Sequence, residues 1–216
     1  MDSERNAATR REPIGVLGGT FDPIHVGHLL LAEHAREQLD LGRVVFVPSA
    51  RPPHKLTEPV TDPEHRYAMA LLATATHPCF CVSRRELDRQ GPSYTIATVR
   101  ELAAEGFDPV YWIVGADAAL DLPNWYEAEA ILREARVVAV ARPGFCLDRL
   151  TEALGPRRAQ MVAVLQAPRF DVSSTAIREA LARGASTRYL LDDAVEAYVR
   201  KHGLYAAGET PRKPSG

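Results

Sequence analysis

A glycine-containing loop carries two histidines three residues apart, His25 and His28, directly before a helical pattern. The loop starts with Gly18-Gly19-Thr20-Phe21-Asp22-Pro23, which follows a short apolar run. Glycines let the backbone approach a phosphate closely, and the first N–H groups of a helix, together with its dipole, favour a negative charge at that point. One histidine lies in the loop and the other in the first helical turn, so both rings can face a ligand held there. We therefore expect this segment to contact a phosphate group.

Three other interpretations of the same loop stay open. A tight turn between a strand and a helix uses glycine without any ligand. A metal ion would need Asp22, His34 or His54 as a further ligand, and the spacing gives a third ligand no clear place. The two histidines could also be ordinary surface residues. The loop has neither the G-x-G-x-x-G pattern nor the Gly-Lys-Ser/Thr ending of a P-loop, which disfavours a dehydrogenase and a P-loop kinase.

A second helix start, far along the chain, also has the composition of an anion site. It has the sequence Asp171-Val172-Ser173-Ser174-Thr175-Ala176-Ile177-Arg178. Ser and Thr cap the helix and leave N–H groups free, and Arg178 lies one turn in, on the side of the helix mouth. An ordinary capped helix with a solvated arginine is the alternative. A polyphosphate needs more than one anion site, so the two helix starts together suggest a triphosphate.

The elements that must position these residues alternate between short apolar runs and helical patterns. The runs are apolar on both faces, as strands of a parallel sheet covered by helices are. This pattern predicts an α/β fold with a doubly wound, mostly parallel sheet, and ligands at the carboxyl ends of the strands. The expected strands are Ile14–Leu17, Val44–Val47, Cys79–Val82, Val110–Val114, Val137–Val140 and Met161–Leu165.

Helix signals lie between and after these strands. Each consists of apolar residues at helical spacing or of a capping residue before such a stretch. The last two helices form a C-terminal appendage to the same domain. The signals are a face of Leu29, Ala32, Ala35 and Leu39, a cap at Asp62-Pro63 for a helix through about Ala75, a cap at Ser93 for a helix to Gly106, and helices Ser174–Arg183 and about Asp192–His202.

Length and composition indicate a single domain over residues 13–205, with polar, Pro-containing tails 1–12 and 206–216 that we expect to be disordered. Of the 216 residues, 46% are hydrophobic and 25% charged, as in an ordinary globular protein. The net charge of -2 gives no support for binding nucleic acid or a membrane. Cys79, Cys81 and Cys146, taken as buried thiols, suggest a reducing compartment, and no signal peptide or membrane span is evident. We expect a cytoplasmic protein.

Several short motifs in order along the chain resemble the bacterial nicotinate-nucleotide adenylyltransferase family of the nucleotidyltransferase superfamily. His25-Val26-Gly27-His28 matches the superfamily signature H-x-G-H, and the segment Ser173 to Arg178 matches its second element. Agreement runs from about Ile14 to Tyr205, and the main departure is Leu17, where the family often has an aromatic residue. The motifs specific to the family are Pro52-Pro53-His54-Lys55, Pro92-Ser93-Tyr94-Thr95, Gly115-Ala116-Asp117, Pro123-Asn124-Trp125-Tyr126 and His202-Gly203-Leu204-Tyr205.

The reaction that this resemblance implies joins the phosphate of nicotinate mononucleotide to the α-phosphorus of ATP and releases pyrophosphate, in NAD biosynthesis. The attacking phosphate is already ionised at pH 7, so no general base is needed. The sequence agrees, because no kinase-like catalytic loop and no Ser/His/Asp triad can be recognised in it. The reaction does need charge cancellation between two anions and in-line placement of the attacking oxygen.

The resemblance also implies roles for single residues. His25, His28 and Arg178 would be catalytic, the histidines at the α-phosphate and Arg178 at the β- and γ-phosphates. The other expected contacts to ATP are Gly18, Gly19, Thr20, Ser173, Ser174 and Thr175. The expected contacts to the mononucleotide are Thr20, Lys55, Asp117, the ring of Trp125, and the main-chain N–H groups of Thr95 and Tyr126. A solvated loop lysine is the alternative for Lys55. Trp112, in an apolar strand, is expected to be structural.

No metal-ligand set is expected in the protein itself. Mg²⁺ would be held mainly by the ATP phosphates and water, as this small and strongly hydrated ion permits. The oligomeric state is open, with a homodimer among the options. Three rival functions remain: the same transfer to nicotinamide mononucleotide, a non-catalytic nucleotide sensor of the same fold, and a metal hydrolase that uses His25 and His28.

Overall fold

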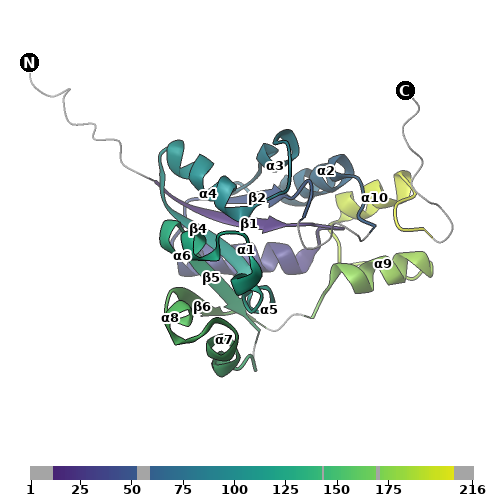
Figure 1. Ribbon diagram of the computed structural model, residues 1–216. Helices are drawn as coiled ribbons and strands as arrows, with labels where there is room; N and C mark the ends of the chain where they lie inside the picture. The colour runs from purple at the N-terminus through teal and green to yellow at the C-terminus, as the bar shows by residue number, and fades with distance from the viewer. Residues whose placement is uncertain (1–11, 53–58, 143, 169–170, 207–216) are drawn as a thin grey trace, which may run out of the picture.

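The computed structural model describes residues 12–52, 59–142, 144–168 and 171–206 (Figure 1). The two segments predicted to be disordered lie outside this part of the chain, except for Glu12 and Ala206. Glu12 corrects the prediction, because it is the first residue of strand β1 and pairs with Phe107 of β4. The prediction of disorder failed at Glu12 because this residue is charged and precedes a proline, whereas its strand pairing is with Phe107, which is distant in the sequence.

Six parallel strands form one sheet in the order β3-β2-β1-β4-β5-β6, which confirms the predicted doubly wound α/β fold. The order of the strands changes direction between β1 and β4, because β2 and β3 lie on one side of β1 and β4, β5 and β6 on the other. Such sheets hold ligands at this point. Each predicted strand is present. The strands are β1 Glu12–Gly19, β2 Val44–Pro48, β3 Phe80–Val82, β4 Phe107–Gly115, β5 Arg136–Ala141 and β6 Val162–Gln166.

The helices lie on both faces of the sheet (Figure 1). Within the described residues they are α1 Val26–Gln38, α2 Pro63–Thr74, α3 Arg85–Asp88, α4 Thr95–Ala104, α5 Ala116–Ala119, the 3-10 helix η2 Leu122–Asn124, α6 Ala128–Glu134, α7 Leu147–Leu154, α8 Pro156–Ala159, α9 Ser174–Ala182 and α10 Asp193–Lys201.

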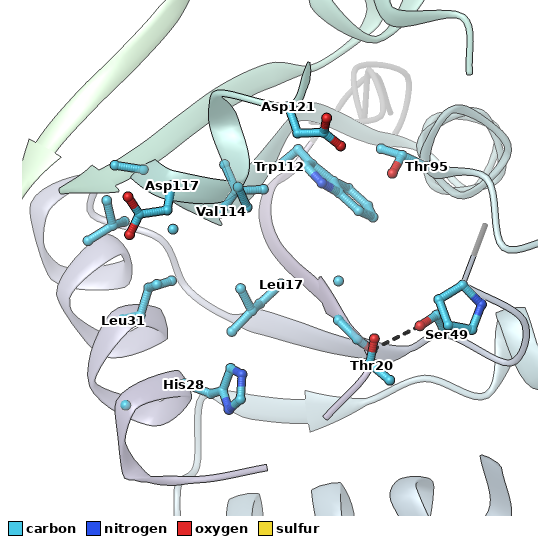
Figure 2. A pocket seen from close by; sticks show the side chains of 18 of the residues that line it. Leu17, Thr20, His28, Leu31, Ser49, Thr95, Trp112, Val114, Asp117 and Asp121 are labelled. Carbon is cyan, nitrogen blue, oxygen red and sulfur yellow. Dashed lines mark hydrogen bonds between the residues drawn. The ribbon is translucent and has the colours of Figure 1, made fainter. Parts of the chain in front are cut away.

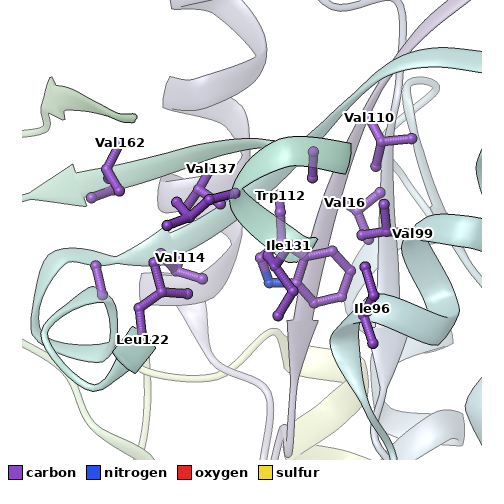
Figure 3. Packing of buried hydrophobic residues seen from close by; sticks show 14 of the residues in the cluster. Val16, Ile96, Val99, Val110, Trp112, Val114, Leu122, Ile131, Val137 and Val162 are labelled. Atoms are coloured by element: carbon purple, nitrogen blue, oxygen red, sulfur yellow. The ribbon is translucent and has the colours of Figure 1, made fainter. Parts of the chain in front are cut away.

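Alternate residues of the strands feed two separate apolar clusters, as the two-residue period of a strand requires. Ile14 and Val16 of β1 point into the cluster under α4, α5 and α6, which Figure 3 shows around Trp112. Leu17 points into the cluster under α1, α2, α9 and α10. Ala32 and Ala35 of α1 are fully buried in that second cluster, which confirms the predicted apolar face of this helix.

Local capping signals were right for α2 and α9 and wrong for α4. The carboxylate of Asp62 accepts a hydrogen bond from the N–H of Glu64, and the hydroxyl of Ser173 accepts one from Ala176. The residue before α4 is Tyr94, not Ser93, because the Ser93 hydroxyl instead accepts from the N–H groups of Ala50 and Arg51. A tertiary contact therefore outcompeted the local cap.

Two further predictions need correction. Met161 precedes β6 and is exposed, so that strand begins one residue later than predicted. The cysteines are not buried thiols, because Cys81 and Cys146 are exposed and Cys79 is half-buried. Cys81 lies on β3 at the edge of the sheet, and Cys146 directly precedes the surface helix α7. The inferred reducing compartment loses this support.

None of the helices in the described part of the chain has both the length and the apolar character that crossing a membrane requires.

Candidate active site

A cavity of about 870 Å³ opens at the carboxyl ends of β1, β4 and β5, a volume typical of small-molecule sites. Its walls come from the loop after β1, the start of α1, the segment before α4, the loop from β4 to α6 and the start of α9. Figure 2 shows His28 at one end of this cavity and Thr95, Trp112 and Asp121 at the other. The cavity is therefore long enough to present different chemistry at its two ends.

Most of the residues predicted for a site line this cavity. They are Gly18, Gly19, Thr20, His25, His28, Thr95, Asp117, Trp125, Tyr126, Ser173 and Ser174. Thr175 and Arg178 do not line it in this structure, although they follow Ser174 on α9. Lys55 lies outside the described residues. Eleven of the fourteen predicted residues thus come together from six separate stretches of the sequence.

The glycine at position 18 has a packing reason of its own. A Cβ atom there would lie 2.6 Å from Cζ2 of Trp112, and at position 19 it would lie 2.9 Å from Cε1 of Phe21. Contacts this short do not occur between carbon atoms without a shift. Trp112 is in the core, as predicted from the sequence, and its indole also forms part of the cavity wall. Glycine at position 18 therefore makes room for that indole.

The two histidines lie ring against ring at the start of α1. Their ring centroids are 3.8 Å apart, and the edge of the Phe21 ring meets His28 at 5.0 Å between centroids. The backbone N–H of His25 donates to Nδ1 of His28 over 3.2 Å. Since Nδ1 of His28 accepts this bond, the proton of its neutral ring belongs on Nε2. His28 thus has a hydrogen-bond donor with a defined position.

Both rings are neutral at pH 7 in the free protein. Burial lowers the pKa of His25 from 6.5 to about 4, and the nearby positive charge of Arg142 acts in the same direction. Burial and the adjacent His25 ring hold the pKa of His28 well below its usual value. Nδ1 of His25 is buried without a hydrogen-bond partner among the described residues. An unpaired polar atom in a cavity wall is costly unless a ligand satisfies it.

The loop that carries the histidines is held in place through Asp22. The Tyr205 hydroxyl donates to one carboxylate oxygen of Asp22 over 2.6 Å, and the Thr61 N–H donates to the other over 3.3 Å. Arg178 donates to the Asp22 carbonyl over 2.8 Å, and the Ser174 hydroxyl donates to the carbonyl of the next residue over 2.9 Å. The C-terminal segment and α9 therefore both brace the loop, and Arg178 contacts the loop rather than the cavity.

Arg66 of α2 is the second brace. Its side chain is fully buried, and its Nη1 donates to the carbonyls of Thr20 and Ser49 over 2.7 Å each. Burial lowers the pKa of this guanidinium, while the negative charge of Asp22 opposes that shift. A buried cation is tolerable only when hydrogen bonds satisfy it, and here the loops after β1 and β2 supply those bonds.

The far end of the cavity is built around the start of α4. Thr95 is the first residue of this helix, and no side chain in the described part of the chain caps it. The first N–H groups of a helix have no partner inside it, so they are available to an acceptor in the cavity. The rings of Tyr94 and Tyr126 stack with centroids 4.3 Å apart. This stack holds together the two segments whose N–H groups were predicted to bind the substrate.

Sequence reasoning missed several lining residues. Arg142 and Arg149 add positive charge to the wall, and Glu86 adds a buried carboxylate. Arg142 directly follows the apolar strand β5, so its place at the carboxyl end of a strand was a usable signal. Glu86, in the charged stretch Arg84 to Arg89, gave no such signal. No group of three or more His, Cys, Asp or Glu that could hold a metal ion occurs among the described residues.

Comparison with known proteins agrees with the class of protein that the fold and the cavity define. Residues 16–180 match the family model described as cytidylyltransferase-like, which defines a nucleotidyltransferase. The chain is 48% identical to a protein of Moorella thermoacetica, over 93% of this chain and 94% of the relative. It is 52% identical to one of Thermus thermophilus, over 89% and 98%. Both carry the name "Probable nicotinate-nucleotide adenylyltransferase".

The chain belongs to the nicotinate-nucleotide adenylyltransferase family, which confirms the resemblance seen in its short motifs. The solved structure of Plasmodium falciparum nicotinic acid mononucleotide adenylyltransferase complexed with NaAD is similar, with a TM-score of 0.72 over 90% of this chain and 98% of that one. The two sequences are 16% identical, so this likeness shows the shared fold.

Proposed function

We infer that this chain is an enzyme that transfers the adenylyl group of ATP to nicotinate mononucleotide, giving nicotinate adenine dinucleotide and pyrophosphate. The observation that carries this inference beyond family membership is the continuous cavity. It joins the stacked His25 and His28 to the uncapped start of α4 at Thr95. One end suits phosphates and the other suits a carboxylate, which is the pair of groups that the two substrates bring.

At the phosphate end, His25 and His28 would contact the α-phosphate. Neutral rings donate hydrogen bonds, and the negative charge of a bound triphosphate raises their pKa values again. The rings therefore become better stabilisers as charge develops in the transition state. The reaction needs no general base, because the attacking phosphate is already ionised at pH 7. Low pKa values in the empty site are compatible with this role.

The remaining ATP contacts would come from two segments, the glycines at the end of β1 and the serines and threonine at the start of α9. Gly18, Gly19 and Thr20 would lie along the adenosine, and Ser173 with the N–H groups of Ser174 and Thr175 would meet the β- and γ-phosphates. Arg178 would join them by turning from the Asp22 carbonyl to the phosphates. Its present hydrogen bond places it on the side of α9 that faces the loop, which supports this role.

At the other end, Trp125 would stack on the pyridine ring, with the N–H groups of Thr95 and Tyr126 at the nicotinate carboxylate. Asp117 would contact the ribose or the phosphate loop, and Thr20 and Lys55 would help to position the two phosphates. The stacked rings of Tyr94 and Tyr126 support the pairing of those two segments. A carboxylate accepts two charge-assisted hydrogen bonds from such a pair.

Mg²⁺ would enter with ATP, held mainly by its phosphates and by water, and would neutralise part of the phosphate charge. The carboxylate of Asp22, next to the phosphate loop, is already committed to Tyr205 and Thr61. Histidine nitrogen is a poor ligand for this ion. EDTA should therefore abolish turnover without lowering the melting temperature, whereas a structural metal would give a loss of both.

The direct test supplies ATP and Mg²⁺ with each mononucleotide and measures initial rates of pyrophosphate release. An amide turns a donor toward one of the two N–H groups and leaves it unpaired, which costs roughly 1.4–2.8 kcal/mol, or about tenfold to a hundredfold in kcat/KM. Nicotinate mononucleotide should be preferred by at least that factor. Equal kcat/KM values would contradict the carboxylate site, and absence of pyrophosphate release would favour a nucleotide sensor.

The histidine pair has its own test. His28→Ala should lower kcat by about 10²-fold or more, as removal of a transition-state donor does, with a much smaller change in ATP affinity. His34→Ala is the matched control, because His34 lies on the same helix and does not line the cavity. Unchanged kcat in a folded His28→Ala variant would show that the ring does not contact the reacting phosphate.

A further inference from the structure

Glu86 is a buried acid in the wall of the cavity, close to the segment that begins α4. Its side chain belongs to α3 and is 5% exposed. The hydroxyl of Thr98, itself fully buried on α4, donates to Oε1 of Glu86 over 2.8 Å. The Ser93 hydroxyl also bonds to this carboxylate. Glu86 thus contacts both the turn before α4 and the first turns of the helix.

Ser93 extends this contact to a third segment. Its hydroxyl accepts from the N–H groups of Ala50 and Arg51, and its own N–H donates to the Arg51 carbonyl over 3.0 Å. Ser93 is therefore fixed on one side by the loop after β2 and on the other by Glu86. Thr95, two residues later, is the first residue of α4 and lines the cavity.

Thr98 is also held from its other side. Nη2 of Arg89 donates to the Thr98 hydroxyl over 3.1 Å, and the same guanidinium is paired with Glu101. Thr98 accepts from Arg89 and donates to Glu86, so the direction of its hydroxyl is defined. The chain of contacts from Arg89 through Thr98 to Glu86 leaves the carboxylate one orientation.

Keeping an acid in this place is costly. Among the described residues Glu86 is held by hydroxyl donors and forms no salt bridge, and burial raises the pKa of its carboxyl. Burying an ionisable group costs free energy, which hydrogen bonds from neutral hydroxyls offset only in part. Its position between three segments that meet at the cavity gives it a geometric use instead.

We propose that Glu86 is a positioning residue for the mononucleotide. Its carboxylate, through Ser93 and Thr98, holds the first turn of α4 so that the N–H of Thr95 meets the substrate carboxylate while Tyr126 meets it from the opposite segment. This inference rests on the proposed function, and it assigns Glu86 no contact with the reacting atoms. The ATP end of the cavity comes from the loop after β1 and from α9, which Glu86 does not brace.

The test compares Glu86→Ala with the wild type in steady-state kinetics. The KM for nicotinate mononucleotide should rise by about tenfold or more, since loss of buried hydrogen bonds frees the helix start. The KM for ATP and kcat should stay within about twofold, a change too small to reflect loss of a hydrogen bond. The preference for nicotinate over nicotinamide mononucleotide should fall, because nicotinamide mononucleotide depends less on the N–H groups of Thr95 and Tyr126 acting as a pair.

Glu196→Ala is the matched control. Glu196 is 6% exposed and likewise bonds to a buried threonine hydroxyl, that of Thr187, but it lies on α10 and does not line the cavity. This variant should lower the melting temperature and leave the KM for the mononucleotide unchanged. Glu86→Gln is the milder variant if Glu86→Ala does not fold, because glutamine has one acceptor oxygen where the carboxylate has two.

The outcomes separate the two claims. A wild-type protein without activity on nicotinate mononucleotide would refute the proposed function and this inference with it. Wild-type activity combined with unchanged KM values in both Glu86 variants would refute the positioning role alone. An equal rise in the KM for ATP and in the KM for nicotinate mononucleotide would refute it too.

Discussion

The contact between Gly18 and Trp112 predicts how the protein responds to one added methyl group. In Gly18→Ala the new Cβ would lie 2.6 Å from Cζ2 and 3.0 Å from Cη2 of the indole. An ordinary carbon contact is about 3.5–4.0 Å, so the ring must withdraw by about 1 Å. Trp112 is 3% exposed and packed against apolar side chains, as Figure 3 shows, so its indole can withdraw only toward the cavity whose wall it forms.

Overpacking of this kind costs about 1–3 kcal/mol in the free energy of unfolding. For a chain of this size each kcal/mol lowers the melting temperature by roughly 2–4 °C. Urea denaturation, followed by the fluorescence of the tryptophans, measures the loss directly. The double variant Gly18→Ala with Trp112→Phe should lose less than the sum of the single variants, because phenylalanine lacks the second ring that carries Cζ2.

Gly42→Ala is the control for a glycine without this constraint. Its Cβ would meet only Oε1 of Glu12, at an ordinary distance of 3.8 Å. We expect its stability to stay within about 0.5 kcal/mol of the wild type, as for most surface substitutions. If Gly18→Ala were equally stable, the indole would not occupy the space above Gly18, and glycine there would have to be explained by the ligand instead.

Burial lowers the pKa of His25 from 6.5 to about 4. As the pH falls below 6.5, the His25 ring takes up a proton in the unfolded chain and stays neutral in the folded protein. The contribution of His25 to the free energy of unfolding is therefore complete above pH 6.5 and is lost as the pH falls toward 4. His25→Asn should therefore reduce the loss of unfolding free energy between pH 7 and pH 5 by about 2 kcal/mol, and parallel pH curves for the two proteins would contradict this cause. Arg178→Lys should lower kcat/KM for ATP by about tenfold or more, because lysine lacks the planar fork that now reaches both Asp22 and Thr175; wild-type kinetics would place Arg178 outside the phosphate site. Trp125→Ala should raise the KM of both mononucleotides by a similar factor in the same assay, because stacking does not depend on the ring substituent, and a selective effect on one of them would show a different contact.

Local patterns in the sequence predicted most of the fold. Runs such as Val44–Val47 are apolar at every position, and only a strand covered on both faces gives each of those side chains a buried place. The helix starts at His25 and Ser173 could also be predicted, because capping side chains bond to backbone groups only two or three residues away. Eleven predicted site residues line one cavity, because most of them follow strands of a parallel sheet and such strands end at the same edge.

What the sequence could not provide are the contacts between distant segments. Asp22 and Tyr205 are 183 positions apart, and Arg66 in a charged helix start looks like a surface residue until the two loops it holds are folded around it. Ser93 looked like a helix cap, but tertiary bonds to Ala50 and Arg51 took its hydroxyl. A residue type and its neighbours encode propensity over one or two turns. The packing of the helices on the sheet determines which buried donor bonds to which acceptor. An unpaired polar group in the interior costs free energy, and its available partners are the groups that the fold brings close in space.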